Sequence, residues 1–246
     1  MTAFWDKIKK WQDGCRPVCT AIVPAAGTSS RMGGENKLFL DLCGVPVLVR
    51  TLQAIDRTEL VDEIVIATQS ELLEAVAELC AQAGLRKRVK VVRGGATRTE
   101  SVLAAAMEAN PKAQLLAVHD GARPLVVPEE FDQTIRFACN TYAAAPAVPV
   151  TDTVKVADET GLVTATPDRS TLYAVQTPQV FRAEILKAAL QAAVSEGAAV
   201  TDDCAAVERL GKQVYLIQGN RENIKITTPI DIAIAEAILR QRGQAI

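Results

Sequence analysis

The feature that most constrains the fold of this chain is an alternation of short apolar runs with longer segments of helical periodicity. Apolar runs bounded by turn-forming residues predict strands over residues 20–25, 63–68, 89–93, 114–119 and 143–150. Between them, apolar residues at three- and four-residue spacing predict helices over 47–55, 71–83, 101–110 and 129–139. Parallel strands need a crossover connection, and a helix supplies it. The sequence therefore predicts a Rossmann-like, doubly wound α/β fold on a mostly parallel sheet.

Residues 151–172 interrupt this alternation. Two short β-like stretches joined by Glu159-Thr160-Gly161 predict a hairpin. An isolated two-stranded hairpin with few large apolar residues is marginal in water, so we predict a protruding arm that packs on a second copy in a homodimer. Beyond the arm, the pattern predicts helices over 183–195, 202–210 and 229–241 and a strand over 213–218.

The chain of 246 residues has no linker-like segment, which predicts a single domain over residues 19–246 that includes the arm. Residues 1–18 form an N-terminal extension, in which Phe4, Ile8 and Trp11 recur at the spacing of a short amphipathic helix. We expect this helix to dock on its own domain or on a partner subunit, because one short basic helix binds lipid weakly.

Charge and hydropathy exclude several partners. The 27 Lys and Arg against 29 Asp and Glu leave a net charge of −2, which gives no overall field for nucleic acid or an anionic membrane. No run approaches the roughly 20 apolar residues that span a bilayer, and no signal peptide is recognisable. The six cysteines lack paired CxxC spacing, so we expect reduced thiols and a cytoplasmic location.

The first predicted strand runs into the loop PAAGTSSRMGG, residues 24–34, followed by Lys37. Small residues let backbone N–H groups approach phosphate oxygens, and Arg31 and Lys37 neutralise charge. The alternative is an ordinary strand-to-helix turn. The loop matches neither GxxxxGK[ST] nor GxGxxG, so a kinase-type ATPase and a dehydrogenase are disfavoured, and the pattern favours a different phosphate-binding loop.

The fourth predicted strand ends in HDGARP, residues 119–124. Asp120 is suited to Mg²⁺, which prefers one or two carboxylates together with phosphate oxygens and water. Capping of the next turn is the equal alternative. His119 is the only histidine and, at a strand end, is more often a packing residue than a catalytic one. Neither HExxH nor GxSxG occurs, which removes the usual residues of zinc hydrolases and α/β-hydrolases.

Further polar clusters follow the third strand and lie in the second half of the chain. The turn RGGATRTES, residues 93–101, allows close backbone approach to a flat base. The others are Arg169, the run QTPQ at 176–179, TDD at 201–203 and NIKITTP at 223–229. Individually each reads equally well as a cap or a turn, since Thr201 precedes a predicted helix and Thr228 precedes Pro229.

Taken in order, these motifs resemble the 2-C-methyl-D-erythritol 4-phosphate cytidylyltransferase family of the isoprenoid pathway. The resemblance covers about residues 20–240 and includes PAAGTSSRM, GGATRTES, HDGARP, DRSTLYAVQTPQVF, TDD and NIKITTPID. Ribitol-5-phosphate cytidylyltransferases share several of these signals, but their first loop usually reads AGG where this chain has PAAG at 24–27. Two positions depart from the family pattern: Leu38 stands where glutamine is frequent, and Ala96 stands where some members have an acidic residue. Neither departure removes a charged group that the reaction requires.

The resemblance implies an enzyme that joins CTP to methylerythritol phosphate with Mg²⁺, held by Asp120 as the metal ligand. A ribitol-5-phosphate cytidylyltransferase and a non-catalytic nucleotide-binding module are the alternatives. The implied catalytic residues are Arg31, Lys37 and Lys225. The implied nucleotide-binding residues are Pro24, Ala25, Ala26, Gly27, Gly95, Ala96, Ser101, Asp120, Gly121 and Ala122. The implied acceptor-binding residues are Arg123, Arg169, Thr177, Thr201 and Lys225, with Arg169 reaching across from the arm of the other subunit.

Overall fold

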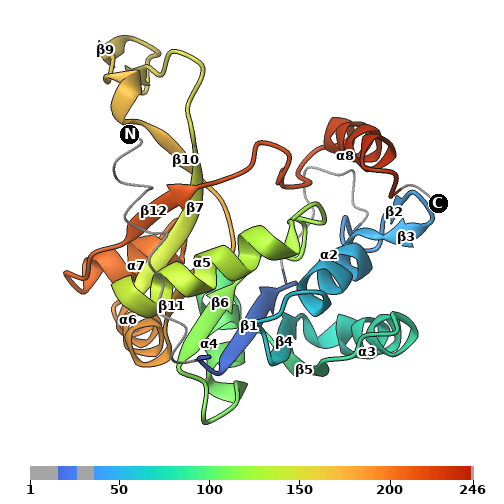
Figure 1. Cartoon of the computed structure of the whole chain (residues 1–246). Coiled ribbons are helices and arrows are strands. Elements are labelled where there is room, and N and C mark those ends of the chain that lie inside the picture. The colour runs from blue at the N-terminus through green and yellow to red at the C-terminus, as the bar shows by residue number, and fades with distance from the viewer. Residues whose placement is uncertain (1–15, 27–35, 245–246) are drawn as a thin grey trace.

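A computed structural model describes residues 16–26 and 36–244, and its centre is an eight-stranded sheet (Figure 1). The strands run in the order β10-β7-β11-β6-β1-β4-β5, and β12 also pairs with β7. One half of the sheet is parallel and contains β1 (Cys19–Pro24), β4 (Glu63–Thr68), β5 (Arg88–Arg93) and β6 (Leu115–Val118). These are four of the predicted strands, and their carboxyl ends lie along one edge.

The other half of the sheet is mixed. It contains β7 (Ala143–Pro149), β10 (Tyr173–Val175), β11 (Gln179–Arg182) and β12 (Tyr215–Gln218). Strand β11 lies between β6 and β7 and is antiparallel to both, whereas β12 runs parallel to β7. Neither β10 nor β11 was predicted, because each is short and adjoins the polar QTPQ run. The mostly parallel sheet is confirmed, and these antiparallel strands are added to it.

Helices cover both faces of the sheet, as the alternation predicts. Successive residues of β1 point to opposite faces, so Ala21 and Val23 belong to one buried cluster and Ile22 to the other. The first cluster includes side chains of α2 (Val47–Asp56), α3 (Leu73–Gln82), α5 (Pro128–Thr141) and α8 (Pro229–Gln241). The second includes side chains of α4 (Arg98–Glu108), α6 (Ala183–Ser195) and α7 (Asp203–Arg209).

Helix starts follow local capping chemistry more closely than apolar periodicity. Helix α4 begins at Arg98, three residues before the predicted start, because Thr97 and Glu100 form a capping box. Helix α7 is capped by the Asp202 side chain, which accepts a hydrogen bond from the Ala205 N–H at 2.8 Å. The predicted cap at Thr201 was therefore one residue early, whereas Thr228 caps α8 as its sequence suggests.

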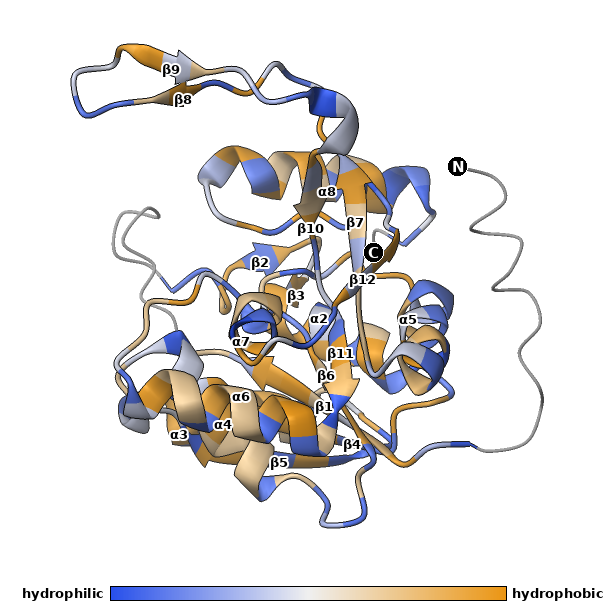
Figure 2. Ribbon diagram, turned by 90° about the vertical axis from the view of Figure 1, so that its left-hand side faces the viewer, coloured by the Kyte–Doolittle hydropathy of each residue, from blue (hydrophilic) through white to orange (hydrophobic). Residues whose placement is uncertain are grey.

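The arm, residues 151–172, projects from the body as the hairpin of β8 (Val156–Ala157) and β9 (Val163–Ala165) (Figures 1 and 2). Gly161 takes a left-handed backbone conformation with φ of 86°, and the Asp158 carboxylate accepts hydrogen bonds within the turn. Apolar residues occur on both arm strands in Figure 2, and Val156, Leu162 and Val163 are exposed. A smaller hairpin of β2 (Asp41–Leu42) and β3 (Val45–Pro46) was not predicted.

Three predictions concern composition or the N-terminus. The five cysteines among the described residues are free thiols, as expected. Within residues 16–26 and 36–244, no helix is long and apolar enough to cross a membrane. The amphipathic helix predicted around Phe4, Ile8 and Trp11 lies outside the described residues, as do Gly27 and Arg31 of the first loop.

Candidate active site

The loops that follow β1, β4 and β5 are fastened to one another at the carboxyl edge of the sheet. The Ala25 N–H donates to the Ala67 carbonyl at 2.7 Å, and the Gln69 amide donates to the Ala26 carbonyl at 2.9 Å. The Gly94 N–H donates to the Thr68 carbonyl at 2.7 Å. Because these parallel strands end at the same edge, the start of the first loop lies against the glycine turn (residues 93–101), at the edge where ligands bind in folds of this type.

The buried hydroxyl of Ser101 stabilises the conformation of the glycine turn. Ser101 Oγ donates to the Thr97 carbonyl at 2.8 Å and accepts from the Gly95 N–H at 3.1 Å. A Cβ on Gly94 would lie 2.7 Å from Ser101 Oγ and 3.3 Å from the Ala26 Cβ, so the backbone approaches the first loop more closely than a side chain would allow. Ala25, Ala26, Gly95 and Ser101 are therefore neighbours, and Ala96 lies exposed on the same turn.

Asp120, directly beyond β6, is surrounded by three cations from three segments. Its Oδ2 lies 2.9 Å from Lys225 Nζ and 3.5 Å from Arg123 Nε, and its Oδ1 lies 3.6 Å from the Arg98 guanidinium. The Asp120 side chain is only 10% exposed, so these charges act with little screening by water. Burial alone would raise the pKa of Asp120, but Lys225, Arg98 and Arg123 hold it well below its usual range. The carboxylate is therefore ionised at neutral pH.

The loop that carries Lys225 is anchored to the other motifs through its backbone. The Ile226 N–H donates to the Ala122 carbonyl at 2.8 Å, and the Asn223 amide donates to the Thr177 carbonyl at 2.9 Å. Arg123 donates in turn to the Asn223 carbonyl at 2.7 Å. HDGARP, QTPQ and NIKITTP thus converge although they are distant in sequence. Lys225 keeps 39% of its side chain exposed beside Asp120, which leaves its ammonium accessible to a ligand.

Comparison with known proteins identifies the family of this chain. The family model for 2-C-methyl-D-erythritol 4-phosphate cytidylyltransferase matches residues 19–241, nearly the whole chain.

The chain belongs to this cytidylyltransferase family.

Relatives of the same name occur in Symbiobacterium thermophilum, 43% identical over 94% of this chain and 97% of that protein, and in Desulforamulus reducens, 44% identical over 91% and 96%. Among solved structures, the 4-diphosphocytidyl-2C-methyl-D-erythritol synthase of Anaerococcus prevotii has a TM-score of 0.82 at 30% identity and covers 92% of this chain and 97% of its own. The 2-C-methyl-D-erythritol 4-phosphate cytidylyltransferase of Thermus thermophilus has a TM-score of 0.73 at 30% identity, with 91% and 99% covered.

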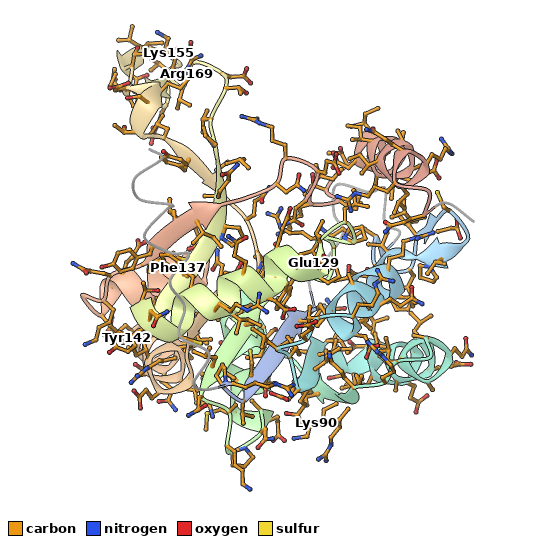
Figure 3. All side chains as sticks on the ribbon, viewed as in Figure 1. Lys90, Glu129, Phe137, Tyr142, Lys155 and Arg169 are labelled. Atoms are coloured by element: carbon orange, nitrogen blue, oxygen red, sulfur yellow. The ribbon has the colours of Figure 1, made fainter. Side chains whose placement is uncertain are left out.

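Not all the residues expected for a cytidylyltransferase gather at Asp120 within one subunit. Arg169 lies on the arm with Lys155, apart from the body, and donates to the Thr151 carbonyl at 2.6 Å (Figure 3). Thr201 is exposed immediately before α7, and Lys37 lies in the turn after the first loop. Thr177 is buried, with its hydroxyl engaged by His119 and by the Asp120 N–H, so much of its hydrogen-bonding capacity is used inside the protein.

Arg98 also lies in the cluster around Asp120, although sequence reasoning did not single it out. Its guanidinium bridges Asp120 and the buried Asp203 of α7, with 2.8 Å to Asp203 Oδ2. Gln179 holds α7 in place by accepting from the Asp203 N–H at 3.1 Å and donating to Asp202 Oδ2 at 2.8 Å. The arginine inside GGATRTES and the aspartates of TDD were both visible in the sequence, but nothing there indicated that they pair.

Replacing Arg98 with methionine is expected to lower the free energy of unfolding by about 3 kcal/mol at mildly alkaline pH, because the Asp203 carboxylate is left buried without its cation. Burial raises the pKa of Asp203, and Arg98 opposes that rise. Removing Arg98 therefore raises this pKa further, and stability is lost as pH rises through the folded-state pKa. Denaturant unfolding at several pH values measures the deficit, which shrinks as pH falls.

The matched control is the double variant Arg98→Met with Asp203→Asn. It removes the buried charge together with its partner, so it should recover most of the stability lost in the single variant. A deficit that is independent of pH, or no recovery in the double variant, would contradict the pairing.

Proposed function

We propose that this chain transfers the cytidylyl group of CTP to 2-C-methyl-D-erythritol 4-phosphate, giving 4-diphosphocytidyl-2-C-methyl-D-erythritol and pyrophosphate. The observation that carries the proposal is the buried, ionised Asp120 with Lys225, Arg123 and Arg98 around it, at the sheet edge where the first loop meets the glycine turn. Such a concentration of cations suits a reaction between two anionic phosphates.

In the proposed reaction, a phosphate oxygen of the acceptor attacks the α-phosphorus of CTP. One P–O bond forms, the bond between the α-phosphorus and the bridging oxygen breaks, and pyrophosphate leaves with the electron pair. The nucleophile is already anionic, so no strong general base is needed. The chain's single histidine fits this chemistry, since burial lowers the pKa of His119 to about 4 and shields it from substrates. The protein then acts by positioning and by neutralising charge.

The proposed roles follow the charges. Lys225, Lys37 and Arg31 neutralise the triphosphate and the charge that grows in the transition state. Backbone groups of the first loop and the glycine turn surround cytosine. The residues of this nucleotide subsite are Pro24, Ala25, Ala26, Gly27, Gly95, Ala96 and Ser101, with Gly121 and Ala122 near the ribose. The acceptor contacts Arg123, Thr177, Thr201 and Lys225, together with Arg169 from the other subunit.

Asp120 has the chemistry to share Mg²⁺ with the triphosphate. Its carboxylate is ionised at neutral pH, and Oδ1 lies 3.6 Å from Arg98, beyond ordinary hydrogen-bonding distance, so Arg98 leaves the lone pairs of that oxygen available. Among the described residues, no group of three or more His, Cys, Asp and Glu is placed to hold a metal ion. Substrate phosphates and water would supply the remaining ligands, an arrangement that Mg²⁺ favours. When bound, the ion would neutralise charge on the phosphate oxygens.

We further propose that the enzyme is a homodimer joined by the arm. A two-stranded hairpin is marginal alone in water, and this one exposes Val156, Leu162 and Val163. Burying these side chains against a second copy would remove apolar surface from water. The same packing would bring Arg169 to the other subunit's site. A cytoplasmic location stays a prediction from the free thiols.

Pyrophosphate release tests the proposed reaction. With Mg²⁺ present, CTP and methylerythritol phosphate should give rapid release, whereas ATP, UTP or ribitol 5-phosphate as replacements should each lower kcat/KM by at least about 100-fold. Chelation with EDTA should abolish release, and added Mg²⁺ should restore it. A preference for ribitol 5-phosphate would replace the acceptor in the proposal, and absence of release with any acceptor would favour a non-catalytic nucleotide-binding module.

A further inference from the structure

His119 is fully buried at the centre of the site and is not used by the proposed mechanism. It follows β6, where its N–H donates to the Ile22 carbonyl at 2.8 Å, and its ring packs against Phe131 of α5 with centroids 5.5 Å apart. The side chain is 0% exposed, so it does not touch a substrate. Any contribution to the reaction must pass through the groups that it contacts.

For a neutral imidazole, the contact of Nε2 with the Arg123 carbonyl assigns the direction of the hydrogen bonds around His119. The Asp120 N–H donates to Thr177 Oγ1 at 3.1 Å. The Thr177 hydroxyl lies 3.0 Å from His119 Nδ1, and His119 Nε2 lies 3.2 Å from the Arg123 carbonyl. A carbonyl only accepts, so Nε2 must carry the proton, and in the neutral ring Nδ1 then accepts the proton of the Thr177 hydroxyl. The other neutral tautomer would set two acceptors face to face at Arg123.

This series of hydrogen bonds connects both ends of the turn formed by residues 120–123. The turn is closed by the Arg123 N–H, which donates to the Asp120 carbonyl at 3.0 Å. His119 fastens the Arg123 end through the carbonyl, and through Thr177 it fastens the Asp120 end. The side chains of Asp120 and Arg123 form an ion pair, with 3.5 Å between Oδ2 and Nε. Because the imidazole holds the backbone at both residues, it can set the separation of these two side chains.

We propose that His119 is a positioning residue: as the Nε2–H tautomer, it orients Asp120 toward the triphosphate and Arg123 toward the acceptor phosphate. This rests on the proposed function for the identity of the two ligands, whereas the tautomer rests on the hydrogen bonds alone. Two conservative variants each keep one half of this series of hydrogen bonds and remove the other half. In His119→Asn the amide oxygen replaces Nδ1, and in His119→Gln the amide nitrogen replaces Nε2.

Steady-state kinetics of the two variants should separate the two ligands. His119→Asn keeps the bond from Thr177 and loses the bond to Arg123, so the KM for the acceptor should rise about ten-fold while the KM for CTP changes less than about two-fold. His119→Gln keeps the Arg123 bond and releases Thr177, so the KM for CTP should rise and kcat should fall, each by about ten-fold.

Thr134→Val is the matched control. Thr134 is buried in α5, the helix that contacts the imidazole, and its hydroxyl donates to the Glu130 carbonyl at 2.9 Å. This variant loses one buried hydrogen bond that is not part of the series through His119, so it should lower the melting temperature without changing either KM. Equal changes of both KM values in the two histidine variants would show a merely structural role and overturn the proposal.

The tautomer is measured on the unaltered protein, so this measurement does not depend on whether a variant folds. Because the sequence contains one histidine, protein labelled with nitrogen-15 in its histidine ring gives a single pair of ring-nitrogen signals. The expected NMR spectrum shows protonated Nε2 and unprotonated Nδ1. A protonated Nδ1 would overturn the proposed direction. Failure of the proposed function would appear separately, as wild-type protein with no cytidylyl transfer.

Discussion

Replacing Lys225 with alanine is expected to lower kcat by roughly 10²–10³-fold while the protein stays folded. The ammonium group lies 2.9 Å from Asp120 and is the most accessible cation of the cluster, at 39% exposed against 34% for Arg98 and 11% for Arg123. It can therefore contact the transferring phosphoryl group and stabilise the negative charge that grows there in the transition state. Asp120 keeps two other cations, so the variant leaves no unpaired buried carboxylate.

The measurement is pyrophosphate release under saturating substrates, accompanied by the melting temperature. Lys212→Ala is the matched control, since it removes an exposed lysine beyond the end of α7 and should change neither quantity. A Lys225→Ala enzyme with kcat within about two-fold of the wild type would remove Lys225 from the mechanism.

At an acceptor concentration well below the KM of Arg169→Ala, where both variants have little activity, mixing Arg169→Ala with Lys225→Ala is expected to restore activity when Arg169 acts across the dimer. Arg169→Ala should raise the KM for the acceptor far more than the KM for CTP, because only the acceptor subsite would lose a cation. When Arg169→Ala and Lys225→Ala subunits are exchanged, each mixed dimer has one site with both residues intact. About half of the dimers are mixed, and one of their two sites works, so about one quarter of wild-type activity should return.

The negative control for subunit exchange pairs Lys37→Ala with Lys225→Ala. These two residues are proposed to act in the same subunit, so no mixed dimer contains an intact site and activity should stay absent. No restoration by the Arg169 pair would place Arg169 outside the partner's site. Restoration by the control pair would contradict the assignment of Lys37 and Lys225 to the same subunit. Sedimentation measurements on the same samples establish whether dimers are present.

Local sequence patterns were sufficient to predict much of the fold. The strand at 63–68 and the helices at 183–195 and 229–241 have the predicted bounds, because apolar runs, helical spacing and the Thr228-Pro229 start agree there. The short strands β10 and β11 were missed because the polar QTPQ run joins them and interrupts the apolar pattern. Their stability comes from β6 and β7, which are distant in sequence, so no local pattern could indicate them.

Prediction of the candidate site was limited in the same way, because contacts between residues far apart in sequence leave no local pattern. The fold brings Asp120, Arg123 and Lys225 together, and the roles that the resemblance implies for them stay predictions. Arg98 was missed because its importance depends on Asp203, a partner 105 residues away. The direction of hydrogen bonding through His119 likewise required knowing which oxygen faces each ring nitrogen. Composition supplies the groups, but pairing over long sequence separations determines their roles.

The most direct test of the central claim follows the acceptor's phosphate oxygens through the reaction. The acceptor is prepared with oxygen-18 in its phosphate, incubated with unlabelled CTP and the enzyme, and the products are analysed by mass spectrometry. Attack of that phosphate on the α-phosphorus places all the label in the CDP-linked product and leaves pyrophosphate unlabelled. Label in pyrophosphate, or formation of CDP without a labelled nucleotide product, would contradict cytidylyl transfer.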